Sequence, residues 1–189
     1  MVTLLVCMMT GLALGQGNPR GMDAGDIGQF AVDQRGRYVV YQTEALPDNI
    51  TFDAACSRLD VFLTAKGNTN ATESNRLRSE GSVVMKKHAG IGNYVAGDLH
   101  YTLVVEYDNG EVKYWFTDLA YQPYRNDRYG KRIKATVSPI PLEQEMSKLN
   151  AGIWSKQRRY AYETLEALSD EIASQLKALG KPKVVNTTL

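Results

Sequence analysis

The sequence predicts an α+β fold in two layers, an antiparallel four-stranded sheet with two helices on one face, in the order β-α-β-β-β-α. The clearest observation is the Asn109-Gly110 pair between two alternating apolar strands. This dipeptide favours a two-residue hairpin turn, because both central residues of a type I′ turn have positive φ. The second observation is an amphipathic helical pattern on each side of the strands, as expected when helices cover one face of an antiparallel sheet.

The chain begins with a pattern typical of a secretory signal peptide. Residues 1–15 form an apolar run too short to cross a bilayer, and the run ends in the small residues Ala13 and Gly15, at positions that a signal peptidase recognises. The first basic residue is only Arg20, and a buried N-terminal strand is the alternative. The expected divisions are a signal peptide at 1–15, a flexible leader at 16–36, a single α+β domain at 37–180 and a tail at 181–189.

The domain is predicted to begin with a strand and then a helix, and Lys66-Gly67 is typical of the end of that helix. Residues 38–43 are rich in β-branched and aromatic side chains, which favour a strand. Thr51 is a good N-cap, and an apolar stripe follows it at helical spacing. Cys56 lies inside this stripe, so we expect a buried core thiol. The stripe consists of Phe52, Ala55, Cys56, Leu59, Phe62 and Leu63.

The remaining strands are residues 76–87 and the two arms of the Asn109-Gly110 hairpin. Counting outward from the turn places Glu106 opposite Lys113 and Val104 opposite Trp115. Because side chains alternate across a strand, one face of the hairpin is apolar and should face the core. The core face collects Tyr101, Leu103, Val105, Tyr107, Val112, Tyr114 and Phe116, and the other face collects Thr102, Val104, Glu106, Lys113, Trp115 and Thr117.

A long amphipathic helix is predicted from Trp154 to the stop signal at Gly180-Lys181-Pro182. Arg158 is the only charged member of its apolar stripe. The stripe comprises Arg158, Ala161, Leu165, Leu168, Ile172, Leu176 and Leu179.

Several strings along residues 38–179 match a known pattern. They are the Ser79–Val84 strand, the Tyr101–Gly110 arm, the Tyr114–Asp118 arm and Trp154 with the leucine-rich last helix. In these strings and in its order of elements, the chain resembles a bacterial secreted domain-of-unknown-function family with a TATA-binding-protein-like (TBP-like) fold. The resemblance implies that fold and an address outside the cytoplasm of a Gram-negative bacterium, and it supplies no catalytic residue. The name of the fold does not imply DNA binding, since fold alone does not determine function.

Composition and motifs argue against several classes of function. A net charge of +1 gives no bulk attraction to a polyanion, and no G-x-S-x-G, H-E-x-x-H, P-loop or dinucleotide-binding pattern occurs. The two histidines, His88 and His100, lack metal-ligand spacing, so we expect no metal, cofactor or catalytic residue. The enzymatic alternative is a small hydrolytic enzyme in which His100 and Asp118 form a general-base pair across the hairpin.

A binding surface is the function that the sequence favours. Trp115 lies on the hairpin face away from the expected helices, where an exposed tryptophan is a candidate contact for a protein or a sugar ring. The alternative is that the loop at 121–134 or the leader covers it. Residues 121–134 interleave tyrosines with basic residues, and Tyr124, Arg125 and Arg128 are the candidate contributors from this adjoining loop. We expect a secreted or periplasmic binding module, without a transmembrane span, whose partner is an unknown protein or glycan of the cell envelope. A structural, self-associating envelope subunit is the other alternative, and the secretory signal argues against nucleic acid.

Overall fold

The computed structural model describes residues 30–46, 50–73, 75–89, 92–108 and 110–179. The expected signal peptide, the first part of the leader and the tail lie outside the described residues. The elements in chain order are β1 (Ala31–Val32), β2 (Tyr38–Ala45), α1 (Phe52–Ala65), β3 (Thr69–Glu73), β4 (Arg76–Ala89), β5 (Gly92–Asp108), β6 (Glu111–Asn126), β7 (Arg132–Lys134), β8 (Ile140–Pro141) and α2 (Ala151–Leu179).

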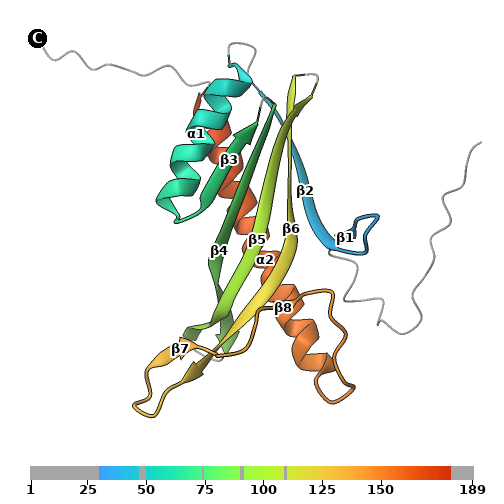
Figure 1. The fold of residues 1–189 in the computed structure, drawn as a ribbon, viewed down its shortest axis with the longest axis vertical. Coiled ribbons are helices and arrows are strands. Elements are labelled where there is room, and N and C mark those ends of the chain that lie inside the picture. Colours follow the sequence, from blue (N-terminus) through green and yellow to red (C-terminus); the bar gives the residue numbers. More distant parts are fainter. Residues whose placement is uncertain (1–29, 47–49, 74, 90–91, 109, 180–189) are drawn as a thin grey trace, which may run out of the picture.

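The strands form one antiparallel sheet in the order β1-β2-β6-β5-β4-β3, with β7 and β8 paired to β6 (Figure 1). The expectation of an α+β fold is confirmed, but the expectation of four strands is wrong, because the sheet has eight. The four expected strands are its long central members, β2, β6, β5 and β4. Each additional strand has only two to five residues, which is too short for an alternating apolar pattern to reveal it.

The hairpin register predicted from Asn109-Gly110 is confirmed, with Val104 paired to Trp115 and Glu106 paired to Lys113. The charges at this end of the hairpin pair differently from the expectation. Glu106 forms its ion pair with Arg76 on β4, and Lys113 forms its ion pair with Asp108. Because exposed ion pairs contribute little to stability, the apolar face is what sets the register.

β6 contains a β-bulge and continues beyond it to Asn126, past the Tyr114–Asp118 arm expected from the sequence. The register between β5 and β6 shifts between His100 and Thr102, and Asp118 is the one non-glycine residue in the described chain with a positive φ, 54°. A bulge of this kind bends the strand and increases its twist. Alternation resumes beyond it, so that Leu119 and Tyr121 are again buried in the core.

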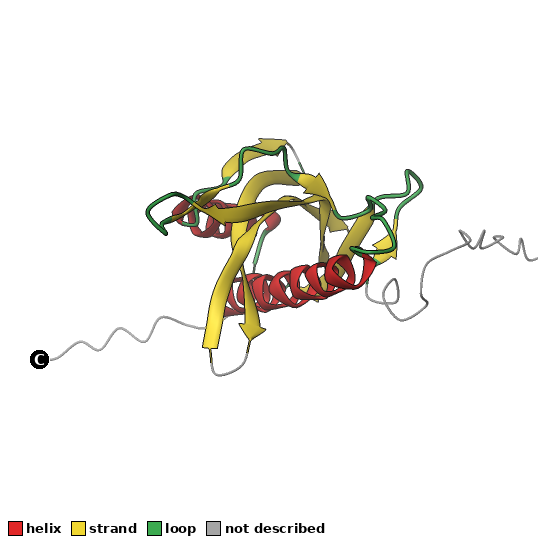
Figure 2. Cartoon of the chain, turned by 90° about the horizontal axis from the view of Figure 1, so that it is seen from below, coloured by secondary structure: helices red, strands yellow, loops and turns green. Residues whose placement is uncertain are grey.

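Both helices pack against one face of the sheet, as expected, and Figure 2 shows α2 running along it. Thr51 caps α1, and its Oγ1 accepts a hydrogen bond from the Ala54 amide at 3.3 Å. Cys56 is buried, and burial raises the pKa of its thiol to about 11, which confirms its place in the core. The largest fully buried side chains are Tyr114, Phe116, Leu59, Leu63, Leu77, Met85, Leu99, Leu103, Leu119, Leu142, Leu165 and Ile172.

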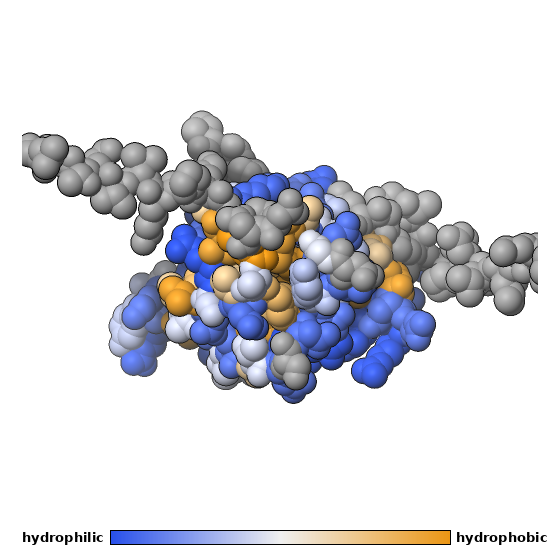
Figure 3. Space-filling model, turned by 90° about the horizontal axis from the view of Figure 1, so that it is seen from above, coloured by the Kyte–Doolittle hydropathy of each residue, from blue (hydrophilic) through white to orange (hydrophobic). Residues whose placement is uncertain are grey.

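Two residues depart from their expected environments at the ends of the sheet. Phe30, in the expected leader, is buried and stacks on Tyr38 at 5.1 Å between ring centroids, so the fold begins before residue 37. Tyr107, expected in the core, is 38% exposed because it lies at the end of the sheet, beyond the core. Its ring stacks on that of Phe52, with 5.6 Å between ring centroids. Figure 3 looks down on this upper end of the molecule, where apolar surface gathers inside a hydrophilic rim.

The charged residue in the apolar stripe of α2 is also explained. Arg158 is buried, with its guanidinium 5.3 Å from the ring centre of Tyr38 and 5.9 Å from that of Trp154. Its Nε donates to the Leu142 carbonyl at 2.8 Å, and a terminal nitrogen donates to the Gln144 carbonyl at 3.2 Å. Arg158 therefore ties the loop after β8 to α2, and it belongs in the stripe as a hydrogen-bonding member of the core.

Candidate functional site

The face of the sheet that points away from the helices, which we call the open face, carries an aromatic pair. Trp115 on β6 is half-buried, and its register partner on β2, Tyr41, is 50% exposed. Their ring centroids are 6.2 Å apart with 23° between the ring planes. On the other side of Trp115 lies its β5 partner Val104, which is only 6% exposed. Tyr41, Trp115 and Val104 thus form one row across three strands, which we call the aromatic row.

Charged residues beside the aromatic row are largely paired with one another. Arg78 lies next to Val104 in the β4–β5 register and pairs with Glu80 at 3.0 Å. Toward the hairpin turn, Arg76 pairs with Glu106. A surface whose charges are mutually neutralised presents the aromatic rings as its distinguishing feature. The aromatic row is therefore suited to contact an apolar or amphipathic group rather than an ion.

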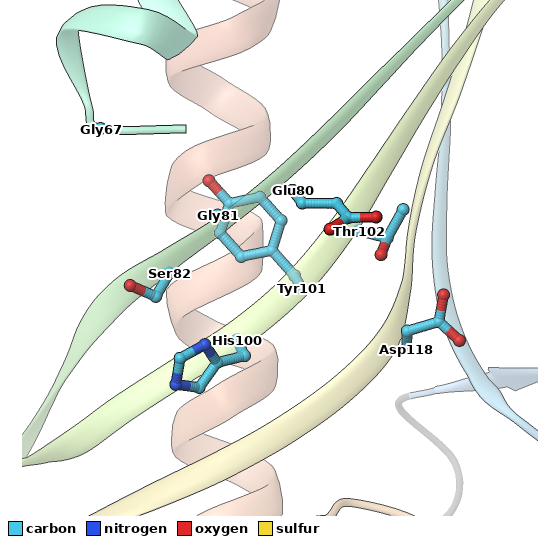
Figure 4. Close-up of a pocket in the computed structure, with 8 residues that line it drawn as sticks. All are labelled: Gly67, Glu80, Gly81, Ser82, His100, Tyr101, Thr102 and Asp118. Carbon is cyan, nitrogen blue, oxygen red and sulfur yellow. The ribbon is translucent and has the colours of Figure 1, made fainter. Parts of the chain in front are cut away.

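A shallow polar hollow of about 380 Å³ lies on the other side of the aromatic row, toward the bulge (Figure 4). Both residues of the enzymatic alternative, His100 and Asp118, line it. Figure 4 shows the His100 ring and the Asp118 carboxylate extending in opposite directions. The lining residues are Gly67, Glu80, Gly81, Ser82, His100, Tyr101, Thr102 and Asp118.

The hydrogen bonds in this hollow do not form a general-base pair. The Asp118 carboxylate accepts from the Arg37 guanidinium, and the buried Nε2 of His100 has no hydrogen-bond partner among the described residues. A catalytic base must lie within hydrogen-bond reach of the group that orients it. Described residues also contain no group of three or more His, Cys, Asp and Glu side chains placed to hold a metal ion.

The remaining candidate residues lie far from Trp115. Tyr124 is on β6 itself, about 30 Å farther along the strand at the usual rise per residue. Its hydroxyl donates to Asp98 Oδ1 at 2.8 Å, and Lys134 Nζ lies 2.8 Å from Asp98 Oδ2. Tyr124 thus has a structural role beside a buried carboxylate.

Arg125 and Arg128 are exposed at the end of β6 and in the turn beyond it. The expected single cluster is therefore two separate surfaces, because residues 121–126 continue β6 instead of forming a loop beside Trp115. Sequence reasoning also missed Tyr41, since nothing local to the sequence indicates that β2 pairs with β6.

These features define a two-layer α+β domain with a TBP-like topology and an accessible aromatic row on its open face. Solved structures that share the fold include two bacterial proteins. A DUF4468 family protein from Bacteroides ovatus has a TM-score of 0.55 and 12% identity, over 87% of this chain and 99% of that chain. A TBP-like protein from Parabacteroides distasonis has a TM-score of 0.55 and 9% identity, over 79% of this chain and 97% of that chain.

The predicted resemblance to a domain-of-unknown-function family with a TBP-like fold is confirmed at the level of the fold. No protein-family model matches the chain, and no curated protein matches it either. In the described part of the chain, no helix has the length and apolar character needed to cross a bilayer.

Proposed function

We propose that this protein is a non-enzymatic binding module that uses the aromatic row on the open face of its sheet, and that it acts in the secreted or periplasmic space. The observation that carries the proposal is the stacked Trp115–Tyr41 pair on the face that the helices leave uncovered, with Trp115 half-buried and Tyr41 50% exposed. Tryptophan and tyrosine are the residue types that most often dominate binding energy, because they bury a large apolar area and retain a hydrogen-bonding group.

The surroundings of the pair support a protein or glycan partner. Val104 provides a buried apolar floor beside Trp115, and the neighbouring ion pairs supply a polar rim. The hollow beyond contributes hydroxyl, carboxylate and imidazole groups that can exchange hydrogen bonds with a polar ligand. An aromatic platform next to such groups fits an amphipathic surface, whether a sugar ring or a protein side chain.

Trp115→Ala should weaken capture of the partner by roughly thirtyfold, the loss expected when an aromatic anchor worth about 2 kcal/mol is truncated. The measurement is affinity capture from an extract of the source organism on immobilised protein, with protein and glycan analysis of the bound material. The control is Ile153→Ala, an exposed apolar residue of α2 at 63% exposure, which should capture the same material as wild type. Equal capture by wild type and Trp115→Ala would contradict the proposed site.

Sedimentation of wild type and Trp115→Ala distinguishes a binding module from a structural, self-associating subunit. If the aromatic row instead mediates self-association, wild type should form oligomers that Trp115→Ala does not form, and no foreign partner should be captured. A wild-type monomer that captures a specific partner supports the binding module.

A further inference from the structure

The lower end of the molecule in Figure 1 carries a basic hairpin, residues 124–134, formed by the end of β6, a tight turn and β7. Asp127 holds the turn. Its Oδ1 accepts hydrogen bonds from the amides of Tyr129 at 2.8 Å and Lys131 at 2.9 Å. Gly130 supplies the positive φ that the turn requires, 77°. The hairpin tip is therefore an ordered structure, and its only acidic side chain is engaged in building it.

Charge is distributed very unevenly between this hairpin and the rest of the chain. The hairpin holds five of the 22 basic residues and one of the 21 acidic residues, so it has a formal charge of +4 while the remainder is −3. Lys134 pairs with the buried Asp98. By contrast, Arg125, Arg128 and Lys131 are exposed and form no ion pair with any described residue. The net charge of +1 is thus the sum of a basic hairpin and a weakly acidic remainder.

An aromatic side chain lies at the centre of this charge. Tyr129, at the tip, is 78% exposed, and the Arg128 guanidinium lies 4.7 Å from the centre of its ring. A tyrosine has an apolar ring and a polar hydroxyl, a combination that is favourable at the boundary between lipid headgroups and acyl chains.

We propose that the basic hairpin docks this protein on the surface of an anionic lipid bilayer, with Tyr129 at the headgroup level and Arg125, Arg128 and Lys131 against the lipid phosphates. Basic residues near an anionic membrane each add attraction, and the negative remainder of the molecule orients the hairpin toward that surface. The open face, at a distance along β6, stays free for its own partner.

The shape of the hairpin favours a membrane over other anionic partners. A convex tip cannot enclose a small ligand, but it can contact a broad flat surface. Single-stranded nucleic acid is bound along a groove that presents several aromatic rings for stacking. Among the aromatic residues of the hairpin only Tyr129 is well exposed, at 78%, whereas Tyr124 is partly buried beside Asp98.

The test is co-sedimentation of the full chain with vesicles of phosphatidylcholine alone and with vesicles that also contain phosphatidylglycerol. We expect binding to the second set only, and weaker binding at high salt. The triple variant Arg125→Gln/Arg128→Gln/Lys131→Gln should bind about a hundredfold more weakly, from about fivefold for each neutralised residue. Its thermal midpoint should be nearly unchanged, since the three side chains are exposed and make no ion pair with a described residue.

A second triple variant is matched in charge. Arg35, Arg58 and Lys156 are exposed residues on three other segments, and their replacement by glutamine changes the net charge by the same amount. This variant should retain most of the vesicle binding. Equal loss in both triple variants would overturn the proposal. Failure of wild type to bind the anionic vesicles would also overturn it. If wild type then binds single-stranded DNA and the hairpin variant does not, the hairpin binds nucleic acid instead of lipid.

Discussion

Replacing Tyr114 with alanine should lower the free energy of unfolding by about 3–5 kcal/mol, the usual cost of removing a buried aromatic side chain. Tyr114 is 1% exposed, it meets Phe116 edge-to-face at 6.5 Å between ring centroids, and its hydroxyl donates to the Ser169 carbonyl at 3.2 Å. The substitution leaves a cavity between β6 and α2 and removes the partner of a buried carbonyl. Urea denaturation followed by circular dichroism measures the effect.

Trp115→Ala is the control, since strand alternation places it one position along and on the opposite face. Its loss should be markedly smaller, because Trp115 is only half-buried and lies on the face that the helices leave uncovered. Equal losses for the two variants would show that Trp115 is a structural residue, and the proposed binding face would lose its main support.

Tyr114 also makes stability depend on pH in the alkaline range. Burial raises its pKa from 10.0 to about 12, so the folded state holds the phenolic proton more tightly than the unfolded state does. The stabilisation that this raised pKa provides to the folded state is therefore complete below pH 10, and it is lost as the pH rises from about 10 to 12. Tyr114→Phe, which keeps the ring and removes the titrating group, should reduce the slope of this part of the stability profile.

Arg158→Ala is the second large effect that we expect, at about 2–4 kcal/mol. It leaves the buried Leu142 carbonyl without its donor, which costs about 1–3 kcal/mol, and it removes a cation that lies over Tyr38 and Trp154. The measurement is again the free energy of unfolding in urea.

The adjacent residue provides the matched control. Arg159 is exposed, and its nearest ion-pair partner is Glu163 at 3.8 Å, so Arg159→Ala should change stability by no more than about 0.5 kcal/mol. Similar losses at positions 158 and 159 would mean that the guanidinium of Arg158 does not hold the loop after β8 in solution.

Local signals explain which parts of the fold could be predicted. The Asn109-Gly110 turn fixes its own hairpin register, and the stripes of α1 and α2 identify their buried faces. The short strands β1, β3, β7 and β8 have only two to five residues each, too few for an alternating apolar pattern to mark them. The sequence also does not indicate the bulge at Asp118, because nothing around this aspartate marks it as a residue with a positive φ.

The candidate site was predicted only in part for the same reason. Trp115 could be assigned to the uncovered face, because alternation from a known turn is a local argument. Its partner Tyr41 could not be found, since that contact depends on the pairing of β2 with β6. The sequence marks residues 121–134 as rich in tyrosine and basic residues, but their distance from Trp115 depends on the continuation of β6 through the bulge to Asn126.

The most direct test of the binding face is site-specific photo-crosslinking. A photoreactive amino acid is placed at position 41, on the open face, or at position 61, on the outer side of α1; both native side chains are well exposed, at 50% for Tyr41 and 67% for Val61. Each protein is then irradiated in an extract of the source organism. A partner that uses the aromatic row should be crosslinked from position 41 and not from position 61. Crosslinking from position 61 alone would place the partner on the helical layer and contradict the assignment of the open face.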